Sequence, residues 1–261
     1  MRANKLVTFS SGAIIGTLGG LIGLGGAEFR LPLLISIFHF AALEAVIINK
    51  ASSLVVVASA LLFRSKAIPF DSVIMHWAII INLLLGSLIG AWLGAGWAIR
   101  LKSQTLYRII AILLIIIACV LVLSHGNNVN EPLVFTGIIQ SILGVIAGFI
   151  IGVIASLLGV AGGEFLIPTL VLLFGLDIKL AGSLSLAISL PTMLTGFMRY
   201  SRDNSFSILS KNYHFVFIMA MGSLLGTFLG GLLLGIIASS VLLPVLSIIL
   251  IISAVKVWQH A

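Results

Sequence analysis

Two glutamates lie inside long apolar stretches, each within two residues of a glycine-rich turn. Glu28 belongs to residues 23–34, GLGGAEFRLPLL, and Glu164 belongs to residues 159–170, GVAGGEFLIPTL. The two stretches are 136 residues apart, and six of their twelve aligned positions are identical. A carboxylate in apolar surroundings is costly and usually functional, so each glutamate could take up and release a proton. It could equally stabilise the free N–H groups at the start of a helix.

The glycine-rich stretches themselves predict a site for an anion. Glycine lets a ligand approach the backbone closely, and the first N–H groups of a following helix are unpaired and carry partial positive charge. A turn that leads into a helix therefore attracts anions. The residues predicted to form this site are Gly25, Gly26, Ala27, Glu28, Gly162, Gly163 and Glu164. The alternative is two turns that pack against each other and bind no ligand.

Two basic residues lie in the same apolar environment, and both break the repeat. Lys50 lies inside the apolar run 43–63 and aligns with Leu186, while Arg30 aligns with Leu166. A buried ammonium needs an anionic partner, unless its long side chain reaches outward to water. We predict that Lys50 binds the substrate and that Arg30 neutralises either Glu28 or the substrate.

Amide and hydroxyl side chains accompany this lysine in both copies of the repeat. Asn49 aligns with Ser185, and Ser53 aligns with Ser189. We predict that these four side chains also contact the substrate. The alternative is that they serve only as hydrogen bonds between helices, as hydroxyls in membrane helices often do.

The composition indicates an integral membrane protein. The chain has 261 residues, of which 61% are hydrophobic and 8% are charged, with a mean hydropathy of +1.30. A soluble domain has about 25% charged residues. The net charge of +7 comes from short loops between apolar runs and forms no nucleic-acid patch. The single cysteine, Cys119, cannot form an internal disulfide.

Neither a metal site nor an enzyme is expected from the motifs. No histidines stand at helical ligand spacing with a carboxylate, and no nucleotide-binding loop or Ser/His/Asp arrangement is convincing. We therefore predict no cofactor and no catalytic residue.

Ten apolar runs predict an all-α fold with five helical segments in each half. The runs cover residues 6–22, 29–40, 43–63, 73–99, 105–124, 133–158, 165–176, 180–198, 213–235 and 241–258. The second run of each half, at about 18 Å of helix, is too short for a hydrocarbon core of about 30 Å. It is predicted to be a short or re-entrant helix, with Pro32 or Pro168 in its first turn, where proline is tolerated.

A second repeated motif indicates close helix packing within two related halves. Residues 86–94 and 222–230 share six of nine positions and carry a glycine every four residues, a spacing that lets membrane helices approach closely. Residues 1–126 and 127–261 are therefore predicted to be two repeats that together form one transport domain.

The basic residues predict the orientation of the chain in the membrane. With the N-terminus in the cytoplasm, eight basic residues face inward and three face outward. Those facing inward are Arg2, Lys5, Arg100, Lys102, Arg199, Arg202, Lys211 and Lys256, and those facing outward are Arg64, Lys66 and Lys179. Five segments per half make the halves inverted repeats and place both termini in the cytoplasm.

The G-x-G-G-x-E-F-x-x-P motif, whose second copy has Ala161 in place of the second glycine, the Asn49–Lys50 pair and the paired G-S-L-x-G helices resemble the sulfite exporter TauE/SafE family over nearly the whole chain. The resemblance implies a multi-pass transporter of the inner membrane that moves small sulfur-containing anions such as sulfite, thiosulfate or sulfonates. A neutral glutamate beside a bound anion would favour coupling to protons. Another small organic anion, a sulfur-containing amino acid and a passive anion channel are alternatives, and a homodimer in the bilayer is left open.

Overall fold

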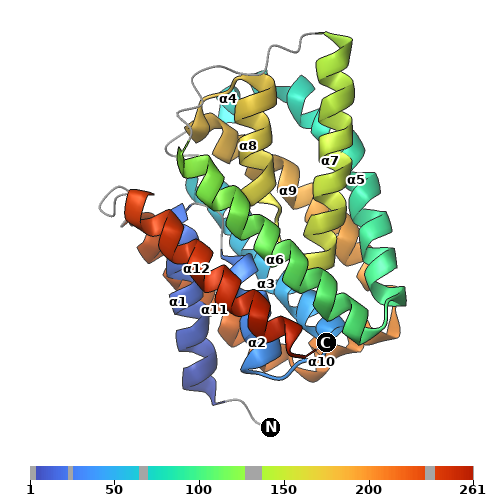
Figure 1. Ribbon diagram of the computed structural model, residues 1–261, viewed down its shortest axis with the longest axis vertical. Coiled ribbons are helices and arrows are strands. Elements are labelled where there is room, and N and C mark those ends of the chain that lie inside the picture. Colours follow the sequence, from blue (N-terminus) through green and yellow to red (C-terminus); the bar gives the residue numbers. More distant parts are fainter. Residues whose placement is uncertain (1–3, 23–25, 65–69, 127–136, 233–238, 261) are drawn as a thin grey trace.

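The computed structural model describes residues 4–22, 26–64, 70–126, 137–232 and 239–260, and Figure 1 shows how they are arranged. Within these ranges the chain forms helices and no strand. The helices are α1 (Lys5–Ile22), α2 (Ala27–Ser36), α3 (Ala42–Arg64), α4 (Phe70–Met75), α5 (Trp77–Arg100), α6 (Ser103–Gly126), α7 (Ile138–Leu158), α8 (Gly163–Phe174), α9 (Ile178–Tyr200), the 3-10 helix η1 (Asn204–Phe206), α10 (Ser207–Lys211), α11 (Tyr213–Leu232) and α12 (Ser239–Trp258). Every predicted apolar run contains a helix, and the predicted all-α fold is confirmed.

Five helices in the described part of the chain are long and apolar enough to cross a membrane. They cover Ala42–Leu61, Trp77–Arg100, Ile138–Leu158, Lys179–Tyr200 and Tyr213–Gly230. Many large apolar side chains on these helices are exposed, as expected of surfaces that face lipid. The prediction of a multi-pass membrane protein is confirmed.

The two short helices form as predicted, but each begins earlier than predicted. α2 has 10 residues and α8 has 12, so neither reaches across a core of about 30 Å. The helices start immediately after Gly26 and Gly162, at Ala27 and Gly163, because these glycines already complete the turn.

The placement of the two prolines in the first turn was therefore wrong. Pro32 and Pro168 lie in the second turn of α2 and α8. There a proline leaves the carbonyl four residues earlier without its helical hydrogen bond. In the two helices that carbonyl belongs to Glu28 and Glu164.

The run predicted at 73–99 is also divided in the structure. His76 separates the short α4 from α5, and its Nδ1 lies 2.8 Å from the carbonyl oxygen of Ser72. Sequence hydropathy misses this break because apolar residues continue on both sides of it.

The 136-residue offset also relates the helices. It maps α1, α2, α3, α5 and α6 onto α7, α8, α9, α11 and α12. The most extensive packing joins α1 to α11 and α5 to α7, so the first helix of each half packs against a helix of the other half.

We call α1, α2, α3 and α11 the first bundle, and α5, α7, α8 and α9 the second. The bundles meet through α3 and α9, and α6 runs beside α12 across the front of the molecule (Figure 1). The opposite membrane orientation of the halves stays a prediction.

The glycine motifs lie where the paired helices cross. A Cβ atom at Gly86 or Gly90 of α5 would collide with the carbonyl oxygen of Val145 or Phe149 of α7, and Gly222 brings α11 equally close to α1. Such close approach replaces the hydrophobic force that lipid cannot supply between helices. The predicted packing role of these glycines is confirmed.

Gly90→Ala should therefore destabilise the second bundle. The added methyl group has no free space, and overpacking of a tight interface costs about 1–3 kcal/mol. The midpoint of thermal unfolding in detergent should fall by several degrees. Ala78→Val adds bulk to an exposed position of the same helix and serves as the control. Equal midpoints for the two variants would show that the crossing tolerates a wider separation.

Candidate functional site

The described parts of the two glycine-rich turns, Gly26 and residues 159–162, lead directly into α2 and α8, which form helix hairpins with α1 and α7. Gly26 and Gly162 adopt left-handed backbone conformations, with φ of 70° and 81°, and no side chain caps the helix that follows either of them. The first residues of these helices, Ala27 and Gly163, are buried. The predicted site residue Gly25 lies outside the described residues. Both helix starts are thus inside the protein, with their N–H groups directed toward its interior.

Asn49 of α3 ties the two hairpin tips together. Its Nδ2 donates to the carbonyl oxygen of Ala27 at 3.0 Å and to that of Leu158 at 3.1 Å. Leu158 ends α7 and Ala27 begins α2, so this one amide satisfies backbone acceptors on both hairpins. Asn49 is fully buried, so the bridge lies inside the protein.

The serines of α9 that align with Asn49 and Ser53 also donate hydrogen bonds to backbone carbonyls. Ser189 Oγ donates to the carbonyl oxygen of Ala161 at 2.7 Å, which satisfies the tip of the second hairpin from α9. Ser185, the repeat partner of Asn49, donates only to Gly182 in its own helix, at 2.9 Å. Both serines are buried. The structure thus brings Ser189 to a tip and leaves Ser185 bonded locally.

Arg30 is fully buried among neutral partners. Its Nη1 donates to Asn49 Oδ1 at 3.3 Å and to Ser53 Oγ at 3.0 Å, and its Nη2 donates to Ser223 Oγ at 3.2 Å. Its Nε has no hydrogen-bond partner. The guanidinium therefore holds α2, α3 and α11 of the first bundle together. It also places one positive charge beside the hairpin tip, close enough to Glu28 for electrostatic attraction.

Lys50 is also fully buried and does not reach outward to water. Its Nζ lies 3.3 Å from Ser156 Oγ, 3.5 Å from the carbonyl oxygen of Ala155 and 5.9 Å from the centre of the Tyr200 ring. Tyr200 in turn donates to the carbonyl oxygen of Ser156 at 2.9 Å. Among the described residues none of these partners carries a negative charge. The alternative of a snorkelling lysine is excluded for this structure.

The two glutamates face each other from opposite hairpins. Glu28 is 1% exposed and Glu164 is 3% exposed, and their carboxyl groups interact electrostatically. None of their four carboxyl oxygens has a hydrogen-bond partner of good geometry. Two negative charges held this close in an apolar interior repel each other strongly, so a proton on one of them would relieve the repulsion.

These side chains form one group, which we call the central polar cluster. Its members are buried and come from both bundles: Glu28, Arg30, Asn49, Lys50, Ser53, Ser156, Glu164, Ser189, Tyr200 and Ser223. Sequence reasoning did not include Ser156, Tyr200 and Ser223. Only Ser223 carried a signal, since it belongs to the repeated G-S-L motif that was assigned to packing. The other two align with Gly20 and Arg64, so the repeat could not identify them.

No metal-binding group is found within the described ranges, where three or more His, Cys, Asp or Glu side chains never gather. Cys119 is exposed on α6.

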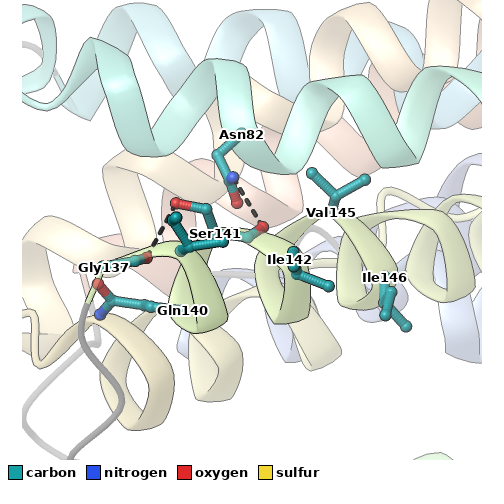
Figure 2. A pocket seen from close by; sticks show the side chains of 8 residues that line it. Asn82, Gly137, Gln140, Ser141, Ile142, Val145 and Ile146 are labelled. Atoms are coloured by element: carbon teal, nitrogen blue, oxygen red, sulfur yellow. Dashed lines mark hydrogen bonds between the residues drawn. The ribbon is translucent and has the colours of Figure 1, made fainter.

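A surface hollow of about 650 Å³ lies elsewhere, between the beginning of α7 and the facing turn of α5. Figure 2 shows Asn82 at this hollow, donating to the carbonyl oxygen of Ser141 at 2.9 Å. Gly137, Gln140 and Ile142 also line it, and no residue of the central polar cluster does. Most of the polar side chains that line this hollow are hydrogen-bonded to the backbone, so few of their polar groups are free to bind a ligand.

Comparisons with known proteins found a family and a relative that this chain resembles. The family described as "Sulfite exporter TauE/SafE" matches residues 5–258. The chain is 26% identical over 205 residues to the "Probable membrane transporter protein YunE" of Bacillus subtilis (strain 168), covering 71% of this chain and 74% of that protein. No solved structure matches the chain.

Asn49→Leu should weaken the join between the hairpin tips. The substitution keeps the size of the side chain but leaves the Leu158 carbonyl and one guanidinium hydrogen without a partner and removes the side-chain bond to Ala27, and each buried unsatisfied group costs about 1–3 kcal/mol. Thermal unfolding in detergent should show a clearly lower midpoint. Ser185→Ala is the matched control, because its hydroxyl bonds only within α9. An equal loss in both variants would argue against a bridging role for Asn49.

Proposed function

This chain belongs to the sulfite exporter TauE/SafE family and is a membrane transporter; on that premise we propose that it is a secondary transporter of small sulfur-containing anions, coupled to protons. Sulfite, thiosulfate and sulfonates are the proposed substrates. The central polar cluster is the proposed site of binding, with the helix starts of α2 and α8 contributing N–H groups.

The observation that carries this proposal is Lys50, a buried ammonium with only neutral partners. Burying a charge without a counter-charge is expensive in an apolar interior, and intramembrane charges usually mark a substrate path. Ser156 and Tyr200 hold the ammonium in place without neutralising it. A small oxyanion is the partner that would complete its coordination.

The charge count of the cluster supports coupling to protons. Arg30 and Lys50 carry two positive charges, and Glu28 and Glu164 carry two negative charges when both are ionised. In that state the cluster is neutral and has little attraction for an anion. One proton shared by the two carboxyl groups leaves one net positive charge, which matches a singly charged anion. Proton uptake and anion binding would therefore assist each other.

Lys50→Met should abolish most transport without unfolding the protein. In proteoliposomes, uptake of radiolabelled sulfite should fall at least about tenfold, which corresponds to 1.4 kcal/mol. The unfolding midpoint should not fall, because an apolar side chain of similar length replaces a buried charge. Lys102→Met, which changes an exposed lysine, should transport normally. Normal sulfite flux through Lys50→Met would remove this residue from the substrate site.

The same assay separates the proposed substrate from its rivals. Thiosulfate, a sulfonate, a simple carboxylate and a sulfur-containing amino acid are tested as competitors of sulfite. Competition by the sulfur oxyanions alone supports the proposal, whereas competition by the carboxylate or the amino acid assigns a different substrate. Uptake that fails to saturate would indicate a passive channel instead.

Glu28→Gln and Glu164→Gln should separate proton coupling from anion movement. Glutamine keeps the shape of the side chain but cannot exchange a proton. Sulfite uptake driven by an imposed pH gradient should fall at least about tenfold, while exchange of sulfite against sulfite without a gradient should continue. Glu44→Gln, at the start of α3 outside the cluster, is the control. A full response to the gradient in both cluster variants would rule out these carboxyl groups as the proton site.

A further inference from the structure

A groove with basic and aromatic walls lies at the opposite end of α5 from the hollow in Figure 2. It has a volume of about 580 Å³ and lies between the ends of α5 and α9 and the second half of α7. The residues that matter here are Trp92, Trp97, Arg100, Phe149, Ile150 and Arg199. The groove shares no lining residue with the central polar cluster.

Three arginines gather at this groove without a counter-charge. The guanidinium carbons of Arg199 and Arg202 lie 5.6 Å and 4.9 Å from the centre of the Trp92 ring, and Arg100 lines the same groove. Within the described ranges none of the three has an acidic partner. The adjacent Asp203 is engaged elsewhere, because its carboxylate accepts from the backbone N–H of Ser205 at 2.9 Å. Three like charges held together this way attract an anion.

The guanidinium of Arg199 is positioned by the backbone beneath it. A Cβ atom at Gly96 would lie 3.3 Å from Arg199 Nε and 3.5 Å from its Nη2, so the missing side chain leaves the room that the guanidinium occupies. Stacking against Trp92 holds the other side of the same group. An arginine fixed on two sides presents its N–H donors with little loss of side-chain entropy.

The rest of the groove is apolar and open to the surroundings. Trp97 is 63% exposed, Ile150 is 51% exposed and Phe149 is 37% exposed. These side chains belong to helices that are long enough to cross the membrane, and Arg100 and Arg199 lie at the ends of such helices. The groove therefore has a charged end at the membrane surface and an apolar wall that continues toward the lipid.

The repeat does not keep the tryptophan or two of the three arginines of this groove. At the 136-residue offset, Trp92 aligns with Phe228, Arg100 with Ile236, and Arg199 with Phe63. Arg202 aligns with Lys66, so the repeat keeps a basic residue at one of the three arginine positions. Basic residues at membrane-helix ends set orientation, yet orientation requires neither a shared tryptophan nor a groove.

We propose that this groove binds an anionic phospholipid. The phosphate would accept hydrogen bonds from Arg100, Arg199 and Arg202, and an acyl chain would lie along the apolar wall formed by Trp97, Phe149 and Ile150. Basic pockets between membrane helices bind anionic head groups in this way. The ligand combines one negative head group with a chain about as long as one leaflet, which fits a charged end and an open apolar wall.

Arg199→Gln combined with Arg202→Gln tests the proposal. Protein in nanodiscs of phosphatidylcholine is titrated with phosphatidylglycerol, and bound lipid is counted by native mass spectrometry. The double variant should bind phosphatidylglycerol at least about tenfold more weakly than the unaltered chain, a difference of 1.4 kcal/mol. Lys102→Gln combined with Lys211→Gln removes two exposed positive charges and should bind like the unaltered chain. Equal weakening in both double variants would reduce the effect to general surface charge and overturn the proposal.

A second arm distinguishes a lipid from a free anion. Inorganic phosphate at millimolar concentration should not displace phosphatidylglycerol from the unaltered chain, because it cannot use the apolar wall. Displacement by phosphate would overturn the assignment to lipid. Because Arg202 is exposed and makes no hydrogen bond in the described structure, the single variant Arg202→Gln should fold normally and provides a second measurement with the same expected direction.

Discussion

Backbone groups that leave a helix inside a membrane must find partners within the protein, and the centre of this molecule is organised by that requirement. Both hairpin tips interrupt a helix at a left-handed glycine, and both are buried. Asn49 and Ser189 supply the missing donors, one from each of the two helices that join the bundles. The hairpin tips are therefore linked through α3 and α9. The polar residues of the cluster lie on these two helices and on the helices that they contact.

The repeat supplies a symmetric frame, and a few substitutions make its chemistry asymmetric. Each half contributes a short helix, a glutamate at its start and a glycine-lined crossing. Both basic residues of the cluster, Arg30 and Lys50, come from the first half and align with leucines in the second. The two glutamates are thus equivalent by symmetry but unequal in surroundings, because only Glu28 has a neighbouring guanidinium.

Sequence predicted the helices well because each is a long apolar run bounded by polar or glycine residues, and it predicted the short helices because length excludes a crossing. It missed the break at His76, where no change in hydropathy occurs, and it placed Pro32 and Pro168 one turn too early. Asn49 and Lys50 could be identified because polar residues in apolar runs are costly. Their partners could not, because Ser156 and Tyr200 belong to the second half and reach Lys50 only where α7 and α9 pack against α3.

Close contacts between helices occur both inside the two bundles and between them. Glycines bring α1 against α11 and α5 against α7 inside the bundles, and Gly159 at the end of α7 comes comparably close to the backbone of Val46 in α3, between the bundles. The cluster adds polar bonds from α3 to α7 at the same junction, namely Asn49 to Leu158 and Lys50 to Ser156. A substrate anion that takes the Lys50 ammonium competes with one of these bonds directly. If the substrate binds more tightly to a second arrangement of the two bundles, binding would favour that arrangement by the difference in affinity. Lys50 would then both bind the substrate and couple its binding to the relative position of the bundles.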